Sequence, residues 1–440
     1  MATLPGTRAG AADWWRRWRA ILPILGAEFV VWLGFGAVLP VLPLFIHDRG
    51  IDLATLGLIV AAWPAARLVG EPLFGALADR MARRPIMVAG LLATGVLLGL
   101  TLVAPGAPAF LVLRALTGLA TSAYDPAARG YLSDSTPPER QGEAFGLYGA
   151  AQMGGLLFGP AIGGLSAAVT GDAGSVFLVG SVAVFAAAVV LATGVRSEPA
   201  HGRSVGVAVT GLVEVPSYDG VLAGRAAAEV ARDPSEVPAG RPASLWNRRL
   251  IAAVVLTSGV NFAAGVSEVN WSLWLTSLGN GLDFIGLTFA AFGASMLLLS
   301  PAAGRRVGRP GTFRFIVAGS SATALAGLLY GLVVDPALIV AVIVFEGASF
   351  AFLSPALYSV AAAGSPLGRT STAQGVFGAA GTIGFIVSSI ASGWLAAIDL
   401  RLPFFLFAAV MVVCLMLALA IGGRRLELRP APAPAREGLR

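Results

Sequence analysis

The sequence predicts an all-α membrane protein, with twelve transmembrane helices arranged as two pseudo-symmetric six-helix bundles. The first observation is composition: 56% of the 440 residues are hydrophobic and only 12% are charged, about half the ~25% that is usual for soluble domains. The second is a series of long apolar runs, and the third is a repeat that relates the two halves. So few charges cannot coat the roughly three soluble domains that this length would otherwise suggest.

Twelve apolar runs are each close to the ~20 residues that a transmembrane helix needs. They cover 21–46, 53–77, 86–104, 109–131, 142–169, 174–195, 250–277, 284–303, 312–334, 337–361, 372–397 and 402–422. The runs divide the chain into an N-terminal bundle (21–195) and a C-terminal bundle (250–422). Between them, the charged segment 196–249 contains Pro and Gly and is expected to be a cytoplasmic linker. Residues 1–20 are expected to be an interfacial segment and 423–440 a tail.

The arginines predict the orientation of the chain in the membrane. All 30 basic residues are Arg, and 25 of them fall in the N-terminal segment, in the loops and adjoining span ends on the same side of the membrane, and in the tail. The loops on the other side hold only Arg49 and Arg401. Because cytoplasmic loops are enriched in Arg and Lys, both termini are predicted to be cytoplasmic. We therefore expect a multi-pass protein of the cell (inner or plasma) membrane, with Trp14–Arg19 as a collar on the cytoplasmic leaflet.

An internal repeat appears when the sequence is shifted by 229 residues. The shift pairs Gly118 with Gly347, Pro126 with Pro355, Pro137 with Pro366, Arg140 with Arg369, and Pro72 with Pro301. Since each half holds six spans, both copies have the same topology. Parallel repeats of this kind are typical of transporters whose two bundles rock around a cavity at the middle of the membrane.

The loop between the second and third spans carries a cluster of charges. It runs from Gly75 through Asp79, Arg80, Arg83 and Arg84 to Pro85. This stretch resembles the signature loop of the major facilitator superfamily, G-x-x-x-D-R-x-G-R-R, with Ala82 in place of the second Gly. The resemblance implies that, in the outward-facing state, Asp79 meets the start of the eleventh span near 372–374. It also implies that Arg83 pairs with an acid at the end of the fourth span, for which Asp134 is the candidate.

Two further motifs support the same family and indicate one branch of it. The fifth span carries Gly155, Gly159, Pro160, Gly163 and Gly164, which resembles the G-x-x-x-G-P-x-x-G-G signature of the drug/proton antiporters. Glycines at this spacing let helices approach closely, and Pro permits a bend. The fourth span carries Arg114, which resembles the buried Arg of the family.

The first span resembles the same branch in a third way. Some multidrug/proton antiporters place a membrane-embedded Glu where this chain has Glu28, twelve residues before Pro40. They also carry an Asp eight residues after that Glu, where this chain has Gly36. The departure counts against a mechanism that uses two acids of the first span.

Ionisable side chains inside the spans are candidates for function, because a charge in the membrane is costly unless it is paired or hydrated. They are Glu28, Arg67, Glu71, Arg114, Asp125 and Arg129 in the first half, and Glu268 and Glu346 in the second. Because the repeat pairs Arg114 with Ile343 and Asp125 with Ser354, one half has kept charges that the other lacks. The N-terminal bundle is therefore expected to handle proton coupling, through Glu28, Arg114, Arg67, Glu71 and Asp125.

Structural alternatives exist for some of these charges. Arg67 and Glu71 are four residues apart on one helical face, where they can simply neutralise each other. Asp125 can form a structural pair with Arg129. Glu28 is the preferred proton carrier.

The second half supplies the acids expected to meet cargo. Glu346 lies near the middle of its span without an evident partner in its own half, so it is expected to bind a cation or carry a proton. Glu268 lies nearer the periplasmic end. Aromatic walls suit lipophilic cations through dispersion and cation–π contact. The expected substrate-binding residues are Glu346, Trp32, Phe35, Asn261, Phe262, Trp63, Phe350 and Glu268.

The leading hypothesis is a secondary active transporter that exports lipophilic or cationic drug-like compounds in exchange for protons, by alternating access. A proton neutralises an acid such as Glu28 and biases the rocking equilibrium, and cargo then leaves outward. The alternative is a transporter of a specific metabolite, such as a sugar, an amino acid or a lipid-like cargo. A polar cargo would need several Asn and Gln in the cavity, and only Gln152, Asn261 and Asn270 are available.

Other classes of function have little support. A membrane-embedded enzyme would need a cluster of His, Cys or acidic residues at the interface. The chain has only two His and the single Cys414, which are too few for such a cluster or for a structural zinc site. The net charge of +6 follows from the cytoplasmic loops and predicts no nucleic-acid partner. We expect a monomer whose partners are a small molecule, protons and the bilayer, with no cofactor besides the proton gradient as energy source.

Overall fold

The described parts of the chain are helical and contain no strand. The computed structural model describes residues 14–15, 17–137, 140–195, 246–306, 312–365 and 370–427. The first half contains α2 (Leu22–Val38), α3 (Leu42–His47), α4 (Leu53–Arg80), α5 (Arg83–Thr101), α6 (Ala107–Asp134), α7 (Gln141–Thr170) and α8 (Ser175–Gly194). The second contains α10 (Arg248–Ser277), α11 (Leu282–Arg306), α12 (Thr312–Leu332), α13 (Pro336–Ala363), α14 (Thr370–Ala396) and α15 (Leu402–Gly422), followed by the short η3 (Gly423–Leu426).

Most of these helices begin and end within a few residues of the predicted spans, and the first span is the exception. It is broken into α2 and α3 by residues 39–41, because Pro40 and Pro43 each lack a backbone N–H and end or begin a helix. Within the described residues, nine helices are long and apolar enough to cross a membrane. The long helices α6 and α7 are not among these nine; α6 carries four charged residues and α7 eight glycines.

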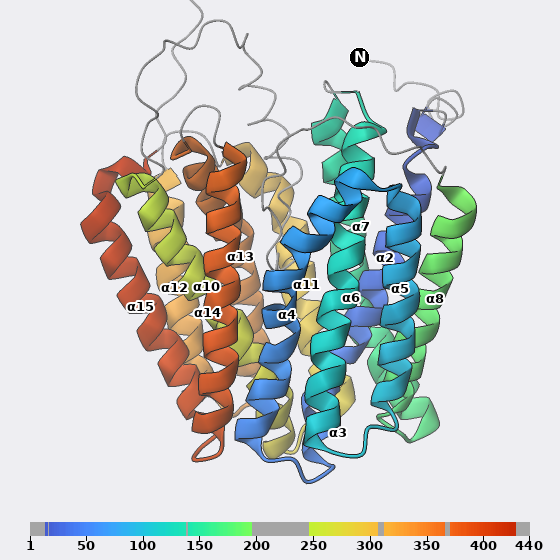
Figure 1. Cartoon of the computed structure of the whole chain (residues 1–440). Helices are drawn as coiled ribbons and strands as arrows, with labels where there is room; N and C mark the ends of the chain where they lie inside the picture. Colours follow the sequence, from blue (N-terminus) through green and yellow to red (C-terminus); the bar gives the residue numbers. More distant parts are fainter. Residues whose placement is uncertain are drawn as a thin grey trace, which may run out of the picture.

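The two halves repeat each other in three dimensions (Figure 1). Helices α6 and α13 have bounds that differ by 229 residues at both ends, and α2 packs on α7 and α8 as α10 packs on α14 and α15. The close glycine contacts repeat as well. A Cβ at Gly118 would meet the carbonyl oxygen of Trp63, and one at Gly347 would meet the carbonyl oxygen of Phe292. Because both pairs keep the 229-residue shift, the small residues of the repeat are explained by helix packing.

The halves meet mainly along two helix pairs, α4 with α14 and α7 with α11, and α10 also contacts α3 and α4. Gly57 and Gly393 let α4 and α14 approach closely at the lower end of Figure 1, and the two helices diverge toward the upper end. Two of the three buried apolar clusters each draw their buried residues from one half. The third, which we call the lower cluster, combines Ile46 and Leu56 of the first half with Leu273 and Phe385 of the second. The described protein is therefore sealed between its halves at the lower end.

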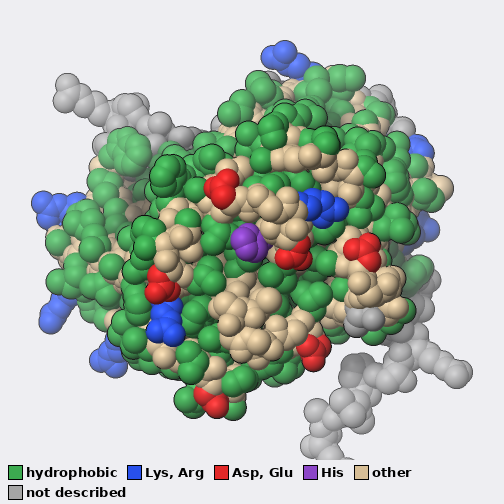
Figure 2. All heavy atoms as spheres, turned by 90° about the horizontal axis from the view of Figure 1, so that it is seen from below, with side chains coloured by type: hydrophobic (Ala, Val, Ile, Leu, Met, Phe, Trp, Pro, Cys, Tyr) green, Lys and Arg blue, Asp and Glu red, His purple; other side chains and the backbone are tan. Residues whose placement is uncertain are grey.

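The lower face carries mainly acidic charges (Figure 2). Its exposed acids are Asp48, Asp52, Asp172, Asp283, Asp335 and Asp399, against Arg49 and Arg401. Two of them cap helices: Asp52 accepts from the Thr55 amide at the start of α4, and Asp335 accepts from the Leu338 amide at the start of α13. This face has the small share of Arg that the sequence predicts for the outer side.

Residues near both ends of the chain pack against the helices, and for Trp18 this differs from expectation. Trp18, predicted to belong to an interfacial collar, is buried within the first half, whereas Trp14 and Trp15 are exposed. The start of the tail is folded: Leu426 is buried, and the Glu427 carboxylate accepts from the Phe313 amide at the start of α12. The predicted linker lies outside the described residues except for 246–249, where Asn247 caps α10.

Candidate transport site

A cavity of about 230 Å³ lies between the two halves. Its walls come from α2, α4 and α7 on one side and from α10 to α14 on the other. The aromatic residues among its lining are Trp32, Phe35, Trp63, Trp271, Phe289, Phe292, Tyr330, Phe350 and Phe385. Ring contacts run along the first half, where Phe35 lies 5.3 Å from Trp32 and 5.2 Å from Trp63 between ring centroids. The cavity is therefore a predominantly apolar chamber with aromatic walls.

Two carboxylates of the second half line this chamber, and each has a distinct partner. Glu346 of α13 accepts a hydrogen bond from the Tyr330 hydroxyl of α12 at 2.5 Å. This corrects the expectation that Glu346 has no partner in its own half. Tyr330 is held by Trp271, whose ring centroid lies 4.7 Å away. Because a hydrogen-bonded carboxylate in an apolar chamber attracts positive charge, Glu346 can receive a cation.

The second carboxylate, Glu268 of α10, pairs with a cation from the other half of the protein. The Arg114 Nη2 atom of α6 lies 3.0 Å from Glu268 Oε1; Arg114 is buried and Glu268 is partly buried. The other ion pairs of the described residues each join groups within the first half. Arg114 and Glu268 therefore form an ionic tie between the halves, which sequence reasoning did not predict for either residue.

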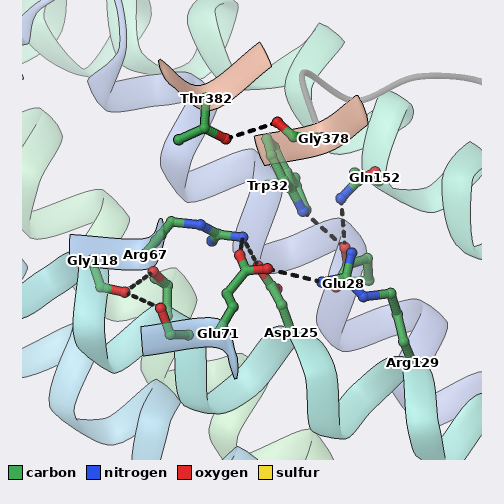
Figure 3. A network of polar contacts seen from close by, with 12 residues as sticks. Glu28, Trp32, Arg67, Glu71, Gly118, Asp125, Arg129, Gln152, Gly378 and Thr382 are labelled. Atoms are coloured by element: carbon green, nitrogen blue, oxygen red, sulfur yellow. Dashed lines mark hydrogen bonds and ion pairs between the residues drawn. The ribbon is translucent and has the colours of Figure 1, made fainter. Parts of the chain in front are cut away.

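Glu28 lies outside the cavity in a pocket of hydrogen-bond donors (Figure 3). Its Oε1 atom accepts from Trp32 Nε1 at 2.8 Å and from Gln152 Nε2 at 3.0 Å, and its Oε2 atom accepts from the Tyr124 hydroxyl at 2.7 Å. The Tyr148 hydroxyl also faces this carboxyl group. Glu28 is completely buried, so these donors replace the water that an ionised carboxylate requires.

A buried ionic network lies beside this pocket, between α4 and α6 (Figure 3). Arg67 pairs with Glu71, as the sequence suggested, and its Nη2 atom lies 2.6 Å from Asp125 Oδ2. Arg129 Nη2 lies 3.7 Å from Glu71 Oε2. The expected pairing of Asp125 with Arg129 is thus replaced by a pairing of Asp125 with Arg67, because Arg67 reaches across from α4. The network places the two acids beside two arginines, so their charges compensate.

The signature loop forms one of the contacts that the family resemblance implied. Arg83 Nη1 lies 2.5 Å from Asp134 Oδ2 at the end of α6, and Arg84 donates to the Ala192 carbonyl of α8. Gly75 is buried and Arg80 is exposed. The predicted contact of Asp79 with the start of α14 falls on side chains outside the described part of the structure.

The glycines of the fifth span pack α7 against α2. Gly36 is the position where the related antiporters were expected to carry an Asp, and here it forms part of a tight crossing. A Cβ at Gly159 would lie 2.7 Å from the Gly36 Cα atom, and one at Gly155 or Gly163 would meet the Phe29 or Ala37 carbonyl. Pro160 continues within α7, where its carbonyl lies near Gly286 of α11, and a Cβ at Gly164 would lie 3.5 Å from the carbonyl oxygen of Leu282.

Six of the eight residues expected to bind substrate line the cavity, and Asn261 and Phe262 do not. The Asn261 amide donates to the Thr257 carbonyl of its own helix, and Phe262 packs in the core of the second half. Both lie on faces of α10 that turn away from the chamber. Sequence reasoning also missed Tyr124, Tyr148 and Tyr330, since a tyrosine in an apolar span gives no sign that its hydroxyl meets an acid.

Comparisons with known proteins agree with this architecture. The family model described as Major Facilitator Superfamily matches residues 24–284 and 266–440. The chain therefore belongs to the major facilitator superfamily, and it is a membrane transporter rather than an enzyme. Among solved structures, the nucleoside transporter NupG superposes with a TM-score of 0.72 over 91% of this chain and 99% of its own, at 14% identity. A likeness at that identity concerns the fold alone.

Two curated relatives have names that refer to drug resistance. Quinolone resistance protein NorA of Staphylococcus aureus is 31% identical over 142 residues, which are 32% of this chain and 37% of that protein. Multidrug resistance protein 2 of Bacillus subtilis is 30% identical over 144 residues, 33% of this chain and 36% of that protein. The matched stretch thus spans little more than a third of each relative. This transporter therefore has drug-resistance proteins among its homologues.

Proposed function

We propose that this transporter exports lipophilic, cationic compounds in exchange for protons by alternating access. The observation that carries the proposal is the chamber between the halves, whose aromatic walls surround the carboxylates of Glu268 and Glu346. Aromatic faces and a carboxylate together bind a lipophilic cation through dispersion, cation–π and Coulomb attraction. The names of the relatives that share about a third of the chain are in keeping with such cargo.

In this proposal Glu28 carries the proton and Glu346 meets the cargo. Glu28 is buried among donors and separate from the chamber, so a proton and a cargo molecule can occupy different sites. The network of Arg67, Glu71 and Asp125 lies beside the pocket of Glu28, and we assign it to the proton path. No cofactor takes part, because the proton gradient supplies the energy.

We propose that the upper end faces the cytoplasm. The protein would lie in the plasma membrane as a monomer. Support comes from the arginines, which are rare on the lower face. With that orientation, the lower cluster closes the outer side, and cargo would enter from the cytoplasmic side or its leaflet. The signature loop, with Arg83 and Asp134, and the glycines of α7 would then control the rocking motion.

A metabolite transporter is the second candidate, and the chamber gives it less support. The polar side chains in its lining, apart from the two acids and Tyr330, are Ser267, Thr288 and Thr323. Gln152 donates to Glu28, and Asn270 donates to the Leu400 carbonyl. The amides that a polar sugar or amino acid would need are therefore used within the protein.

Transport by proteoliposomes tests the proposal. Vesicles with an acidic lumen are expected to accumulate external ethidium, and collapse of the pH gradient with nigericin should abolish the accumulation. Glu346→Gln should weaken ethidium transport at least about tenfold, since a charge-assisted contact is lost. The matched control is Glu143→Gln, which changes an exposed Glu at the start of α7 and should transport as the unmodified protein does. Ethidium accumulation that is the same with and without the pH gradient would contradict antiport.

A further inference from the structure

Trp32 belongs both to the pocket of Glu28 and to the wall of the cargo chamber. Its indole N–H donates to Glu28 Oε1 at 2.8 Å, while its ring lines the chamber. Of the described hydrogen-bond partners of Glu28, the other three, Tyr124, Gln152 and Tyr148, are not among the lining residues. A change at Glu28 therefore reaches the chamber most directly through this one indole ring.

The donors around Glu28 respond differently when the carboxylate takes up a proton. A tyrosine hydroxyl both donates and accepts, and a glutamine amide offers an oxygen as well as a nitrogen, so Tyr124 and Gln152 can turn to accept from a protonated Glu28. An indole N–H only donates. When Glu28 is neutral, the hydrogen bond from the Trp32 indole is no longer strengthened by charge. The equilibrium between hydrogen-bonded and released Trp32 should then shift about tenfold toward release.

The position of Trp32 sets the position of neighbouring aromatic rings in the chamber. Its ring meets Phe35 edge to face, with centroids 5.3 Å apart, and Phe35 contacts Trp63 in turn. All three rings line the chamber. Because closely packed rings cannot shift independently, release of Trp32 would reshape the wall contributed by the first half.

We propose that Trp32 is the positioning residue that couples the charge of Glu28 to cargo affinity: the ionised carboxylate holds the indole in the wall, and protonation releases it. This inference rests on the proposed role of Glu28 as the proton carrier. It adds the physical link by which a proton outside the chamber changes the binding of a molecule inside it, without any contact between the two.

Other titratable and charged groups lie near Glu28 and contribute to any pH dependence. From α6 these are Tyr124, Asp125 and Arg129; from α7, Tyr148; and beyond them the Arg67 and Glu71 pair of α4. Helix α8, which also packs on α2, carries none. In the chamber itself Glu268 and Glu346 titrate in direct contact with cargo. The share that belongs to Glu28 is thus the difference between the unmodified protein and Glu28→Gln.

The test measures binding of tetraphenylphosphonium, whose charge is constant with pH, to the purified full chain by calorimetry between pH 5.5 and 8.5. The ratio of the Kd values at the two ends of this pH range should be about tenfold smaller in Glu28→Gln than in the unmodified protein. Trp32→Phe, which keeps a ring but removes the N–H, should show the same reduction in this ratio, and the double variant should show no further loss. Phe292→Leu is the control: this ring of the chamber contacts the Phe350 ring, with centroids 5.9 Å apart, so its Kd should change equally at every pH.

The outcomes separate this inference from the proposed function. If Glu28→Gln flattens the pH profile while Trp32→Phe keeps it, Glu28 remains the proton site and the coupling through Trp32 is wrong. If Glu28→Gln leaves the profile unchanged, the proton role of Glu28 fails and the coupling fails with it. Should Trp32→Phe not fold, 3-benzothienylalanine at position 32 keeps the size of the indole without the N–H, and the same flat profile is expected.

Discussion

The ionic tie between Arg114 and Glu268 should decide how firmly the lower end is closed. At 3.0 Å the Coulomb attraction is about 5 kcal/mol for an effective dielectric constant of ~20. Removal of one partner from a buried pair costs about 3–5 kcal/mol, since the other charge stays buried and unpaired. In Glu268→Gln, Arg114 is buried and has lost this ion pair when the halves are closed. When the halves separate, water can reach Arg114. The open-to-closed ratio should therefore rise about a hundredfold or more.

Distances between spin labels on the two halves measure this shift. Val169 and Ile398 are more than three-quarters exposed at the lower end, one in each half, and Val169→Cys with Ile398→Cys provides label sites once Cys414→Ser has removed the native thiol. Glu268→Gln should move the distance distribution from a short to a long population. The double variant Arg114→Gln with Glu268→Gln, which leaves no unpaired charge, should return most of it. An unchanged distribution in Glu268→Gln would refute the role of the pair in closure.

Three further predictions concern stability in detergent. Gly159→Ala should cost about 1–3 kcal/mol and lower the melting temperature, since its Cβ would press on Gly36; Gly26→Ala, with open space around it, should not. Asp52→Ala should cost about 1 kcal/mol of unfolding free energy at neutral pH, because the α4 cap is lost. Hydrogen bonds lower the pKa of Asp52, so this difference in stability should disappear as the pH falls through that lowered pKa. A difference that persists at lower pH would contradict the role of the ionised Asp52 as the cap. Arg83→Gln, in a partly exposed pair, should change the unfolding free energy by less than about 1 kcal/mol; a larger loss would show that the loop is structural.

The sequence predicted the helices and the repeat well because these depend on local patterns. Apolar length places a span, and Pro places its end, as the break between α2 and α3 illustrates. The contact of Arg83 with Asp134 was also predictable, since the family resemblance supplied the spacing between two helix ends. The aromatic residues Trp63 and Phe350 were predicted to bind substrate, and both line the cavity.

The partners of the buried charges could not be predicted in the same way. Partner choice depends on the rotation of each helix and on side-chain reach across gaps of several ångströms, which no periodicity encodes. Arg114 was expected to act on protons within its own half, yet it meets Glu268 of the other half. Glu28 was predicted to carry the proton, but its hydrogen bonds with Trp32, Tyr124 and Gln152 were not predicted.

The transporter should exchange outward movement of cargo for inward movement of protons. Proteoliposomes loaded with tetraphenylphosphonium and the pH dye pyranine, voltage-clamped with valinomycin and K⁺ and given no initial pH gradient, test it directly. Cargo efflux should acidify the lumen, and Glu28→Gln should abolish the acidification. The exchange would be contradicted if the unmodified protein released tetraphenylphosphonium faster than protein-free vesicles do, while the pH of the lumen stayed the same as in those vesicles.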